Sequence, residues 1–356
     1  MENTISTLPH ELLGEVFKQC ASICSDAPIV LGAVSRLFRH IVYTTPPVWT
    51  HLKLDVGIGS RKPTLWFSMS KACNVDVQID MARMGRPGYR TDVSETVVDV
   101  STVLATLRLY THRVASLYLR TDTQVQACAA LAAVYSDIPP TCIALRSLHL
   151  KVAKASGSDP LPTFPAIPTI TDLEITNVAL FALPNLNLDN LRNLRIVQPL
   201  LSTPIAVDDV LNIVRFAPCL QQLAVEARIA DPTATTRDNT SFMPQLGELY
   251  LRVNNLVALL DRFVIPALRV LHLRDLDGKR ANASEEIGAA LHRLLARTEL
   301  KGNSELRVFE LAGIKLEGSN LLRQNIDSQS TSRETSKTFR CWKTGFTDAA
   351  NWANNI

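Results

Sequence analysis

Two copies of one short pattern stand in the stretch QLGELYLRVNNLVALLDRFVIPALRVLHLRD, residues 245–275. In each copy an apolar residue is followed, after two spacers, by a second apolar residue and, after one more spacer, by a third. The last two apolar positions are two residues apart, so both side chains point to the same side of a short strand. The pattern therefore predicts strands that each bury one row of leucines against neighbouring strands of the same kind.

The pattern recurs along the chain on both sides of this stretch. Its copies are Trp49/Leu52/Leu54, Val114/Leu117/Leu119, Leu145/Leu148/Leu150, Ile170/Leu173/Ile175, Leu191/Leu194/Ile196, Leu220/Leu223/Val225, Leu246/Leu249/Leu251, Leu268/Leu271/Leu273 and Leu306/Phe309/Leu311, with a weaker one at Val77/Ile79. From the second copy onward the starts are 31, 25, 21, 29, 26, 22 and 38 residues apart, which leaves room for one strand and one return segment. This spacing predicts an α/β fold in which stacked repeats form a solenoid with a curved parallel sheet.

The return segments differ in length and in expected structure. Helical spacing of apolar residues appears in three of the longer ones, as Val97/Val100/Leu104/Leu107, Val125/Cys128/Leu131/Tyr135 and Ile287/Leu291/Leu294/Leu295. A short return such as Thr176 to Leu191 has room only for turns or for one helical turn. We therefore expect helices in the long returns and turns in the short ones.

Composition excludes several classes of function. The 356 residues carry 37 Lys+Arg against 34 Asp+Glu, a net charge of +3, so no basic field is expected that would hold a nucleic acid. Met1 to His10 has neither a basic cluster nor an apolar run, and no apolar stretch approaches the roughly 18 residues that span a bilayer. We expect an intracellular protein, cytoplasmic or nuclear or both, that binds neither nucleic acid nor membrane.

The first fifty residues have helical rather than strand periodicity. Thr7 or Ser6 is placed to cap a first amphipathic helix with Pro9 in its first turn. A second helix is expected to begin after Pro28 and to continue through Ile41. About fifty residues make a marginal core, so these helices need further surface to pack against.

Residues 5–51 resemble an F-box in five separated elements: LPHELL, then VF, a second helix led by proline, VSRLFRHI, and TPPVW. In that family the motif docks on a Skp-type adaptor, which joins a cullin and a RING protein in a ubiquitin ligase. Carried over by position, the adaptor-binding residues implied by the resemblance are Leu8, Pro9, Leu12, Val16, Phe17, Val34, Phe38, Ile41 and Trp49. Two departures are Phe38, where the family usually has tryptophan, and a longer loop from Ala21 to Ala27. The alternative is a helical hairpin that simply packs on the rest of the chain.

The repeats of residues 52–318 are similar to the irregular leucine-rich repeats of F-box proteins. Residues 319–356 contain a polar run followed by an aromatic segment, and are expected to be a tail or a cap on the last repeat, or partly disordered. The expected domains are therefore an F-box over 1–51, a leucine-rich repeat solenoid over 52–318 and a C-terminal segment over 319–356.

The residues between the leucines are expected to line the open concave face, where a target would bind. The predicted target-binding residues are Tyr118, Arg120, His149, Lys151, Arg195, Tyr250, Arg252, His272 and Arg274. Equal positions on neighbouring strands should pair Tyr118 with His149, Tyr250 with His272, and Arg252 with Arg274. Paired arginines repel unless an anion lies between them, which suggests an acidic or phosphorylated target segment. The alternative is that these arginines are solvated or bridge to Glu248.

No catalytic constellation is found in the sequence. It has no GxSxG, GxxxxGK[ST] or HExxH motif, and no catalytic residue, metal ligand or cofactor is expected. The resemblance implies a non-catalytic, substrate-recognition subunit of a cullin–RING ubiquitin ligase, with an adaptor and a protein substrate as partners. Two alternatives remain: an F-box scaffold without a role in degradation, and a leucine-rich repeat binding module whose N-terminal helices only cap the repeats.

Overall fold

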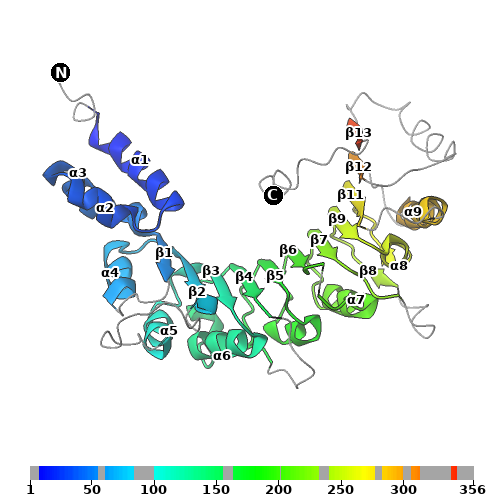
Figure 1. Cartoon of the computed structure of the whole chain (residues 1–356), viewed down its shortest axis with the longest axis horizontal. Helices are drawn as coiled ribbons and strands as arrows, with labels where there is room; N and C mark the ends of the chain where they lie inside the picture. The colour runs from blue at the N-terminus through cyan, green and yellow to red at the C-terminus, as the bar shows by residue number, and fades with distance from the viewer. Residues whose placement is uncertain are drawn as a thin grey trace. The chain divides into compact units, whose positions relative to one another are not determined.

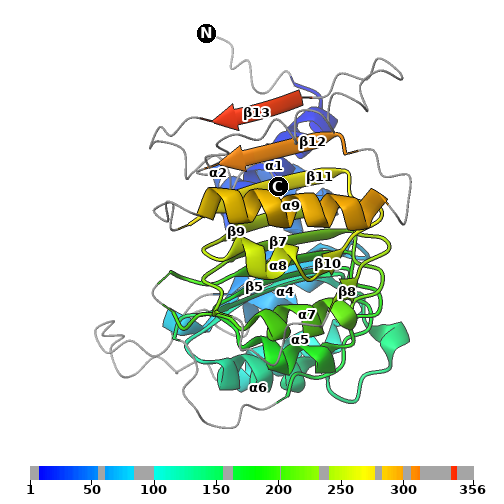
Figure 2. The same cartoon turned by 90° about the vertical axis from the view of Figure 1, so that its right-hand side faces the viewer.

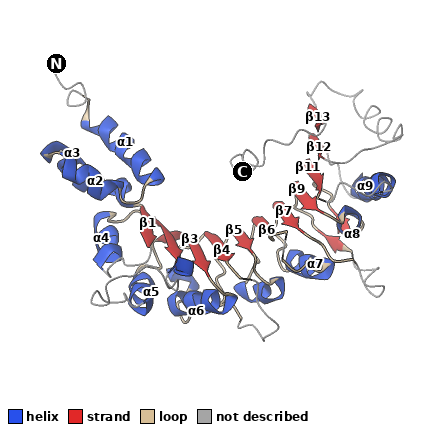
Figure 3. Cartoon of the chain, in the orientation of Figure 1, coloured by secondary structure: helices blue, strands red, loops and turns tan. Residues whose placement is uncertain are grey.

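The computed structural model divides the chain into two compact units, Met1–Asn190 and Leu191–Ile356. It describes residues 8–54, 61–83, 100–154, 163–200, 202–231, 240–276, 283–299, 306–312 and 338–342. Both units are built from parallel strands with helices between them, which confirms the predicted α/β class (Figures 1 and 3). That the strands form leucine-rich repeats stays a prediction.

The chain begins with three helices instead of the two predicted. These are α1 (His10–Ile23), α2 (Ala27–Val34) and α3 (Arg36–Thr44), followed by a 3₁₀ turn, η2 (Pro46–Trp49). The predicted second helix is wrong because Ser35 is extended, with φ −156° and ψ 167°. Its hydroxyl oxygen accepts a hydrogen bond from the Phe38 backbone N–H at 3.1 Å, which caps a new helix.

The start of α1 also differs from the prediction. The N-cap position is held by Pro9, which makes no side-chain capping bond, and the predicted caps Ser6 and Thr7 lie outside the described residues. Proline has no N–H to satisfy, and with ψ at 145° Pro9 stays outside the helix while its carbonyl accepts hydrogen bonds from the Leu12 and Leu13 N–H groups, both at 3.1 Å. Glu11 in the first turn adds a favourable charge near the positive end of the helix dipole.

In the first unit five parallel strands follow one another in chain order. They are β1 (His51–Leu54), β2 (Val75–Asp80), β3 (Val114–Thr121), β4 (Ser147–Val152) and β5 (Asp172–Thr176). The return segments contain α4 (Arg61–Met69), α5 (Val100–Leu109), α6 (Gln124–Tyr135) and the 3₁₀ turns η3 (Met81–Arg83), η4 (Pro140–Cys142) and η5 (Leu180–Leu186). Figure 1 shows α4, α5 and α6 on one side of these strands.

In the second unit the sheet order is β6 (Asn193–Val197), β7 (Gln222–Ala227), β9 (Glu248–Val253), β11 (Val270–Asp275), β12 (Val308–Ala312) and β13 (Thr338–Trp342). A separate parallel pair is formed by β8 (Ser241–Phe242) and β10 (Phe263–Val264). The helices are α7 (Val207–Arg215), α8 (Leu256–Leu260) and α9 (Ala283–Glu299). Figure 2 shows these helices together on one side of the strands.

The leucines are aligned across the strands as predicted. In the first unit Leu117 lies in register with Leu148, and Leu148 with Leu173. In the second unit Leu249 lies in register with Leu271 and with Leu223. Each of these side chains is at most 3% exposed, so burying it contributes about 1.5–3 kcal/mol. We call these aligned, buried rows the leucine ladder.

The expected helical returns are confirmed by α5, α6 and α9, and the expected short return by η5. Within the C-terminal segment, residues 338–342 form β13, which extends the sheet by pairing with β12. Residues 319–337 and 343–356 lie outside the described residues. Within the described part of the chain, no helix is both long and apolar enough to cross a membrane.

Candidate functional site

The first candidate surface is the solvent side of α1. Leu12 and Val16 are one helical turn apart and are 55% and 51% exposed, while Leu13 and Phe17, about 100° further round the helix, are 3% and 2% exposed. Leu8, just before the helix, is exposed as well. The helix thus has two apolar sides, and only one of them is covered by the rest of the chain.

A second apolar side is exposed on α2. Ile29, Val30 and Val34 are 51–62% exposed. Val34 belongs to the predicted adaptor-binding set, whereas Ile29 and Val30 were not predicted. The signal for them was the helix sequence APIVLGAV, which is apolar on every side and which a region of about fifty residues is too small to cover completely.

The exposed large apolar side chains are concentrated in these helices. Eight of the fifteen in the described residues belong to the first three helices or, in the case of Leu8, to the segment just before them; we call these eight the apolar helix surface. They are Leu8, Leu12, Val16, Ile23, Ile29, Val30, Val34 and Tyr43. Such a concentration of exposed apolar groups is typical of surfaces that bind a protein, a membrane or a ligand.

Three of the predicted adaptor-binding residues are not on this surface. Phe17, Ile41 and Trp49 are each 2% exposed and belong to the core, where they support the helices from beneath; that they contact a partner stays a prediction. Phe38 is half-buried, with its ring centre 4.9 Å from that of Phe17. The remaining five predicted residues, all exposed, are Leu8, Pro9, Leu12, Val16 and Val34.

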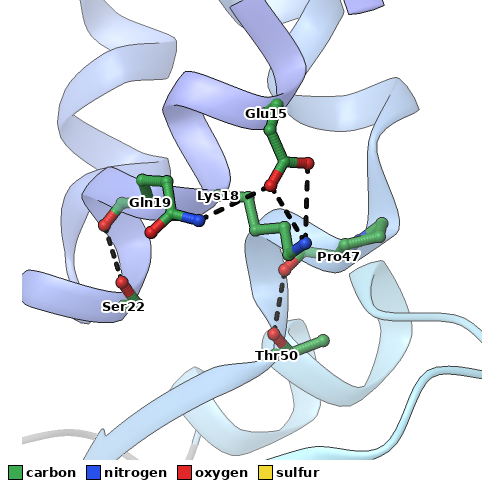
Figure 4. Close-up of polar contacts among 6 residues, drawn as sticks. All are labelled: Glu15, Lys18, Gln19, Ser22, Pro47 and Thr50. Atoms are coloured by element: carbon green, nitrogen blue, oxygen red, sulfur yellow. Dashed lines mark hydrogen bonds and ion pairs between the residues drawn. The ribbon is translucent and has the colours of Figure 1, made fainter. Parts of the chain in front are cut away.

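Figure 4 shows the polar side chains of α1. Lys18 Nζ lies 3.1 Å from Glu15 Oε1, Gln19 Nε2 donates to the same carboxylate at 3.5 Å, and the Ser22 hydroxyl donates to the Gln19 carbonyl. These polar groups bond to one another within the helix. A protein partner would therefore gain most of its binding energy from Leu12 and Val16, whose exposed apolar area no described residue covers.

The second candidate surface is the polar face of the strands, which consists of the residues that alternate with the leucine ladder. The predicted neighbours are confirmed: Tyr118 pairs with His149, and Tyr250 with His272. The Tyr250 and His272 rings are stacked, with centres 4.6 Å apart and planes 8° apart. The Tyr118 and His149 rings are 6.5 Å apart and tilted.

The predicted arginine pair has a different environment from the one expected. Arg252 does lie beside Arg274, but its Nη1 is 2.5 Å from Glu226 Oε1 on the neighbouring β7. The partner of Arg252 is thus Glu226 and not Glu248, which the alternative named; the Glu248 carboxylate accepts a hydrogen bond from the Tyr250 hydroxyl at 3.1 Å. The charge of Arg252 is therefore balanced by Glu226 within the protein, and an anionic target segment is not needed to hold Arg252 beside Arg274.

Three further internal ion pairs lie on the polar face. Arg120 Nη1 lies 3.3 Å from Asp80 Oδ2, and two histidines contact carboxylates: His149 with Glu174 at 3.3 Å and His272 with Glu310 at 2.7 Å. Lys151 and Arg274 are exposed, and Arg195 is half-buried. All nine predicted target-binding residues therefore lie on the polar face, divided between the two units.

Tyr250 should titrate at unusually high pH. Burial, with the neighbouring Glu248 carboxylate, raises the pKa of its hydroxyl to about 12. An unfolded chain loses a tyrosine proton near pH 10, so the stabilising effect of this proton is complete below pH 10 and lost as the pH rises to about 12. We expect wild type to lose stability relative to Tyr250→Phe between pH 10 and 11 in urea unfolding. A constant difference across that range would contradict the environment described for Tyr250.

Comparisons with known proteins add no assignment. No family model matches the sequence, and no curated protein matches it. Among the described residues no group of three or more His, Cys, Asp or Glu side chains is arranged to hold a metal ion. The functional argument therefore depends on the apolar helix surface and on the polar face.

Proposed function

We propose that the chain is a substrate-recognition subunit of a cullin–RING ubiquitin ligase. The three N-terminal helices would act as an F-box that binds a Skp-type adaptor, and the strands would act as leucine-rich repeats that bind the target. The chain itself would carry out no chemistry. It would bring target lysines close to the ubiquitin carrier and so raise their effective concentration.

The apolar helix surface is the observation that carries this proposal. Leu12 and Val16 are exposed on a helix that buries Leu13 and Phe17, and Leu8 and Pro9, just before the helix, are exposed as well. The four exposed residues belong to the LPHELL and VF elements that resemble an F-box. A stretch that resembles an adaptor-binding motif and exposes its apolar residues is what docking on an adaptor requires.

The polar face supports the second half of the proposal. It presents tyrosine, histidine and arginine side chains on rigid strands, and tyrosine and arginine are residues that contribute strongly to binding energy at protein interfaces. Their positions are set by the leucine ladder beneath them, so little conformational entropy would be lost when a target binds.

The proposal predicts that the apolar helix surface is needed to bind the adaptor. Replacing Leu12 and Val16 together by aspartate should weaken capture of a purified Skp-type adaptor at least about 100-fold, because burying each side chain in an interface contributes about 1.5–3 kcal/mol. Both positions are exposed, so the variant should remain folded. Affinity is measured by calorimetry with the full-length chain.

The matched control is Leu109→Asp with Val125→Asp. These two residues are 72% and 50% exposed on α5 and α6 of the same unit, so the variant introduces the same charges on comparable apolar sites. It should bind the adaptor like wild type. Equal affinity of the Leu12/Val16 variant and wild type would reject the adaptor half of the proposal.

One observation favours a second candidate, in which the N-terminal helices only cap the repeats. Trp49 and Trp66 are both buried, with ring centres 5.0 Å apart, and they connect η2 to α4. Helices that only cap the repeats would need such a packing contact with the first repeat, but they would not need Leu12 and Val16 to be exposed. Adaptor capture therefore separates the two candidates, and transfer of polyubiquitin to a bound target separates a ligase subunit from a scaffold.

A further inference from the structure

The polar face of each unit carries side chains of the same chemical kinds at the same positions. In β3 the sequence LYLR spans residues 117–120, and in β9 it spans 249–252. The next strand of each unit has a histidine followed two residues later by a cation: His149 and Lys151 in β4, and His272 and Arg274 in β11. Acidic residues lie on the strands at either side of each such pair: Asp80 in β2 and Glu174 in β5, and Glu226 in β7 and Glu310 in β12.

The register places all six side chains at equal positions. In the first unit Asp80 pairs with Arg120, Tyr118 with His149, Arg120 with Lys151, and His149 with Glu174. In the second unit the corresponding pairs involve Glu226, Tyr250, Arg252, His272, Arg274 and Glu310. We call each set of six a Tyr–His cluster.

Packing does not account for this repetition. The leucine ladder requires apolar residues at the buried positions only, and the alternate positions face away from it. The connections also differ, because Tyr118 and His149 are 31 residues apart in the sequence whereas Tyr250 and His272 are 22 apart. The two clusters therefore share their polar residues although their return segments differ.

The contacts within the clusters correspond as well. Arg120 and Arg252 each form an ion pair with the acidic residue of the preceding strand, Asp80 and Glu226 respectively. His149 and His272 each contact the glutamate of the following strand, Glu174 and Glu310 respectively. The Nε atoms of Arg120 and of Arg252 are both buried, and neither has a hydrogen-bond partner among the described residues. The second cluster is the tighter one, with its rings stacked and its histidine 0.6 Å closer to the carboxylate, 2.7 Å against 3.3 Å.

One cation of each cluster is left over from these internal pairs. Lys151 and Arg274 are exposed, and no ion pair is found for either within the described part of the chain. Lys151 lies directly beside Arg120, and Arg274 beside Arg252, and both of these arginines already have an acidic partner. The tyrosine–histidine pair of each cluster lies two residues earlier along the same two strands. An acidic side chain that approached either cluster would meet an exposed cation and would not displace an existing carboxylate.

We propose that the two Tyr–His clusters are equivalent sites that each bind an acidic peptide segment, so that the chain recognises a partner carrying two such segments. Lys151 and Arg274 would pair with an aspartate or glutamate of the segment, and the tyrosine–histidine pair would contact its neighbouring side chains. Two sites engaged by one partner would raise its affinity by about 10²–10⁴ over a single segment. This inference deepens the target-binding half of the proposed function.

The test uses a peptide selected on the protein itself. A display library of random 12-residue peptides is selected on the full-length chain, and an enriched peptide is synthesised and titrated by calorimetry. We expect enrichment of peptides with two or more acidic residues, and two bound peptides per chain. Lys151→Glu and Arg274→Glu should each remove one bound peptide, and the double variant should remove both.

The controls are Arg61→Glu and Arg215→Glu, which reverse exposed cations on α4 and α7, away from the polar face. They should bind two peptides like wild type, and Lys151→Gln and Arg274→Gln should reproduce the losses without adding a negative charge. Circular dichroism of every variant confirms that it is folded.

A second arm joins two copies of the selected peptide by Gly/Ser linkers of graded length. At least one tandem peptide should bind wild type about 100-fold more tightly than the single copy, and either single reversal should abolish that gain. A single bound peptide, selected peptides without acidic residues, or no selectable peptide would overturn the inference. None of these assays contains the adaptor, so adaptor capture and peptide binding fail independently.

Discussion

Replacing Arg113 by methionine is expected to lower the free energy of unfolding of the first unit by about 3–5 kcal/mol. The Arg113 guanidinium donates hydrogen bonds to the Phe67 carbonyl at 2.8 Å, to the Ser70 hydroxyl at 2.6 Å and to the Cys73 carbonyl through two nitrogens. It thereby joins the end of α4 and the turn before β2 to the start of β3.

The size of the effect follows from what the substitution leaves behind. Phe67 and Ser70 are at most 1% exposed, so water cannot replace the lost donor to their oxygens without opening the packing. The guanidinium also lies 5.5 Å from the centre of the Phe67 ring, which itself stacks on Tyr110 at 4.2 Å. A lysine at position 113 should restore only part of the stability, because one ammonium group lacks the fork geometry of guanidinium.

Urea unfolding followed by tryptophan fluorescence measures this effect in a background that carries Trp342→Phe and Trp352→Phe, since the two remaining tryptophans, Trp49 and Trp66, both belong to the first unit. Arg61→Met, which removes an exposed arginine from α4, is the matched control and should change the stability by no more than about 0.5 kcal/mol. An Arg113→Met variant within 1 kcal/mol of wild type, roughly one ordinary hydrogen bond, would show that this network contributes little.

Replacing Trp49 by alanine should also cost about 3–5 kcal/mol. The Trp49 ring is packed against Trp66, it stacks on Tyr43 with ring centres 6.0 Å apart, and its Nε1 donates to the Val42 carbonyl at 2.9 Å. Trp66 Nε1 in turn donates to the His51 carbonyl, so the two indoles link α3 and η2 to β1 and α4. Removing one of them opens a cavity at this joint.

The conservative variant Trp49→Phe distinguishes structure from binding. It keeps an aromatic ring but removes the donor to Val42, so stability should fall by about 1–3 kcal/mol. Adaptor affinity should not change, because Trp49 is buried and absent from the apolar helix surface. A fall in adaptor affinity as large as that of the Leu12/Val16 variant would instead place Trp49 in the interface.

The strands were predictable because their signal is local and repeated. A spacing of two residues identifies the buried side of a strand, and equal spacing in successive copies identifies the register, as Leu249 and Leu271 show. That Tyr250 lies beside His272 followed from that register, whereas the stacking of their rings did not, since Tyr118 and His149 pair in the same way and are tilted. The Arg252–Glu226 pair was predictable by the same argument, since the copies at Leu220 and Leu246 set these two residues side by side, but the sequence interpretation overlooked it.

The N-terminal helices were less predictable because their apolar residues lie on more than one side. Periodicity groups Leu12, Leu13, Val16 and Phe17 together, and it does not state which of them the rest of the chain covers. The break between α2 and α3 at Ser35 was not predicted for a related reason. The apolar spacing continues through Ser35, although the Phe38 N–H donates to the Ser35 hydroxyl and a new helix begins there.

The parallel α/β architecture, the residues of the leucine ladder and the residues of the polar face could all be inferred from the sequence, because each depends on spacing along one strand and its repetition. Only the tertiary structure decided which apolar residues of the first helices stay exposed, which charges of the polar face are balanced internally, and that Lys151 and Arg274 remain exposed in matching clusters. Exposure and ion pairing depend on what covers a side chain in space, and residues far apart in the sequence provide that cover.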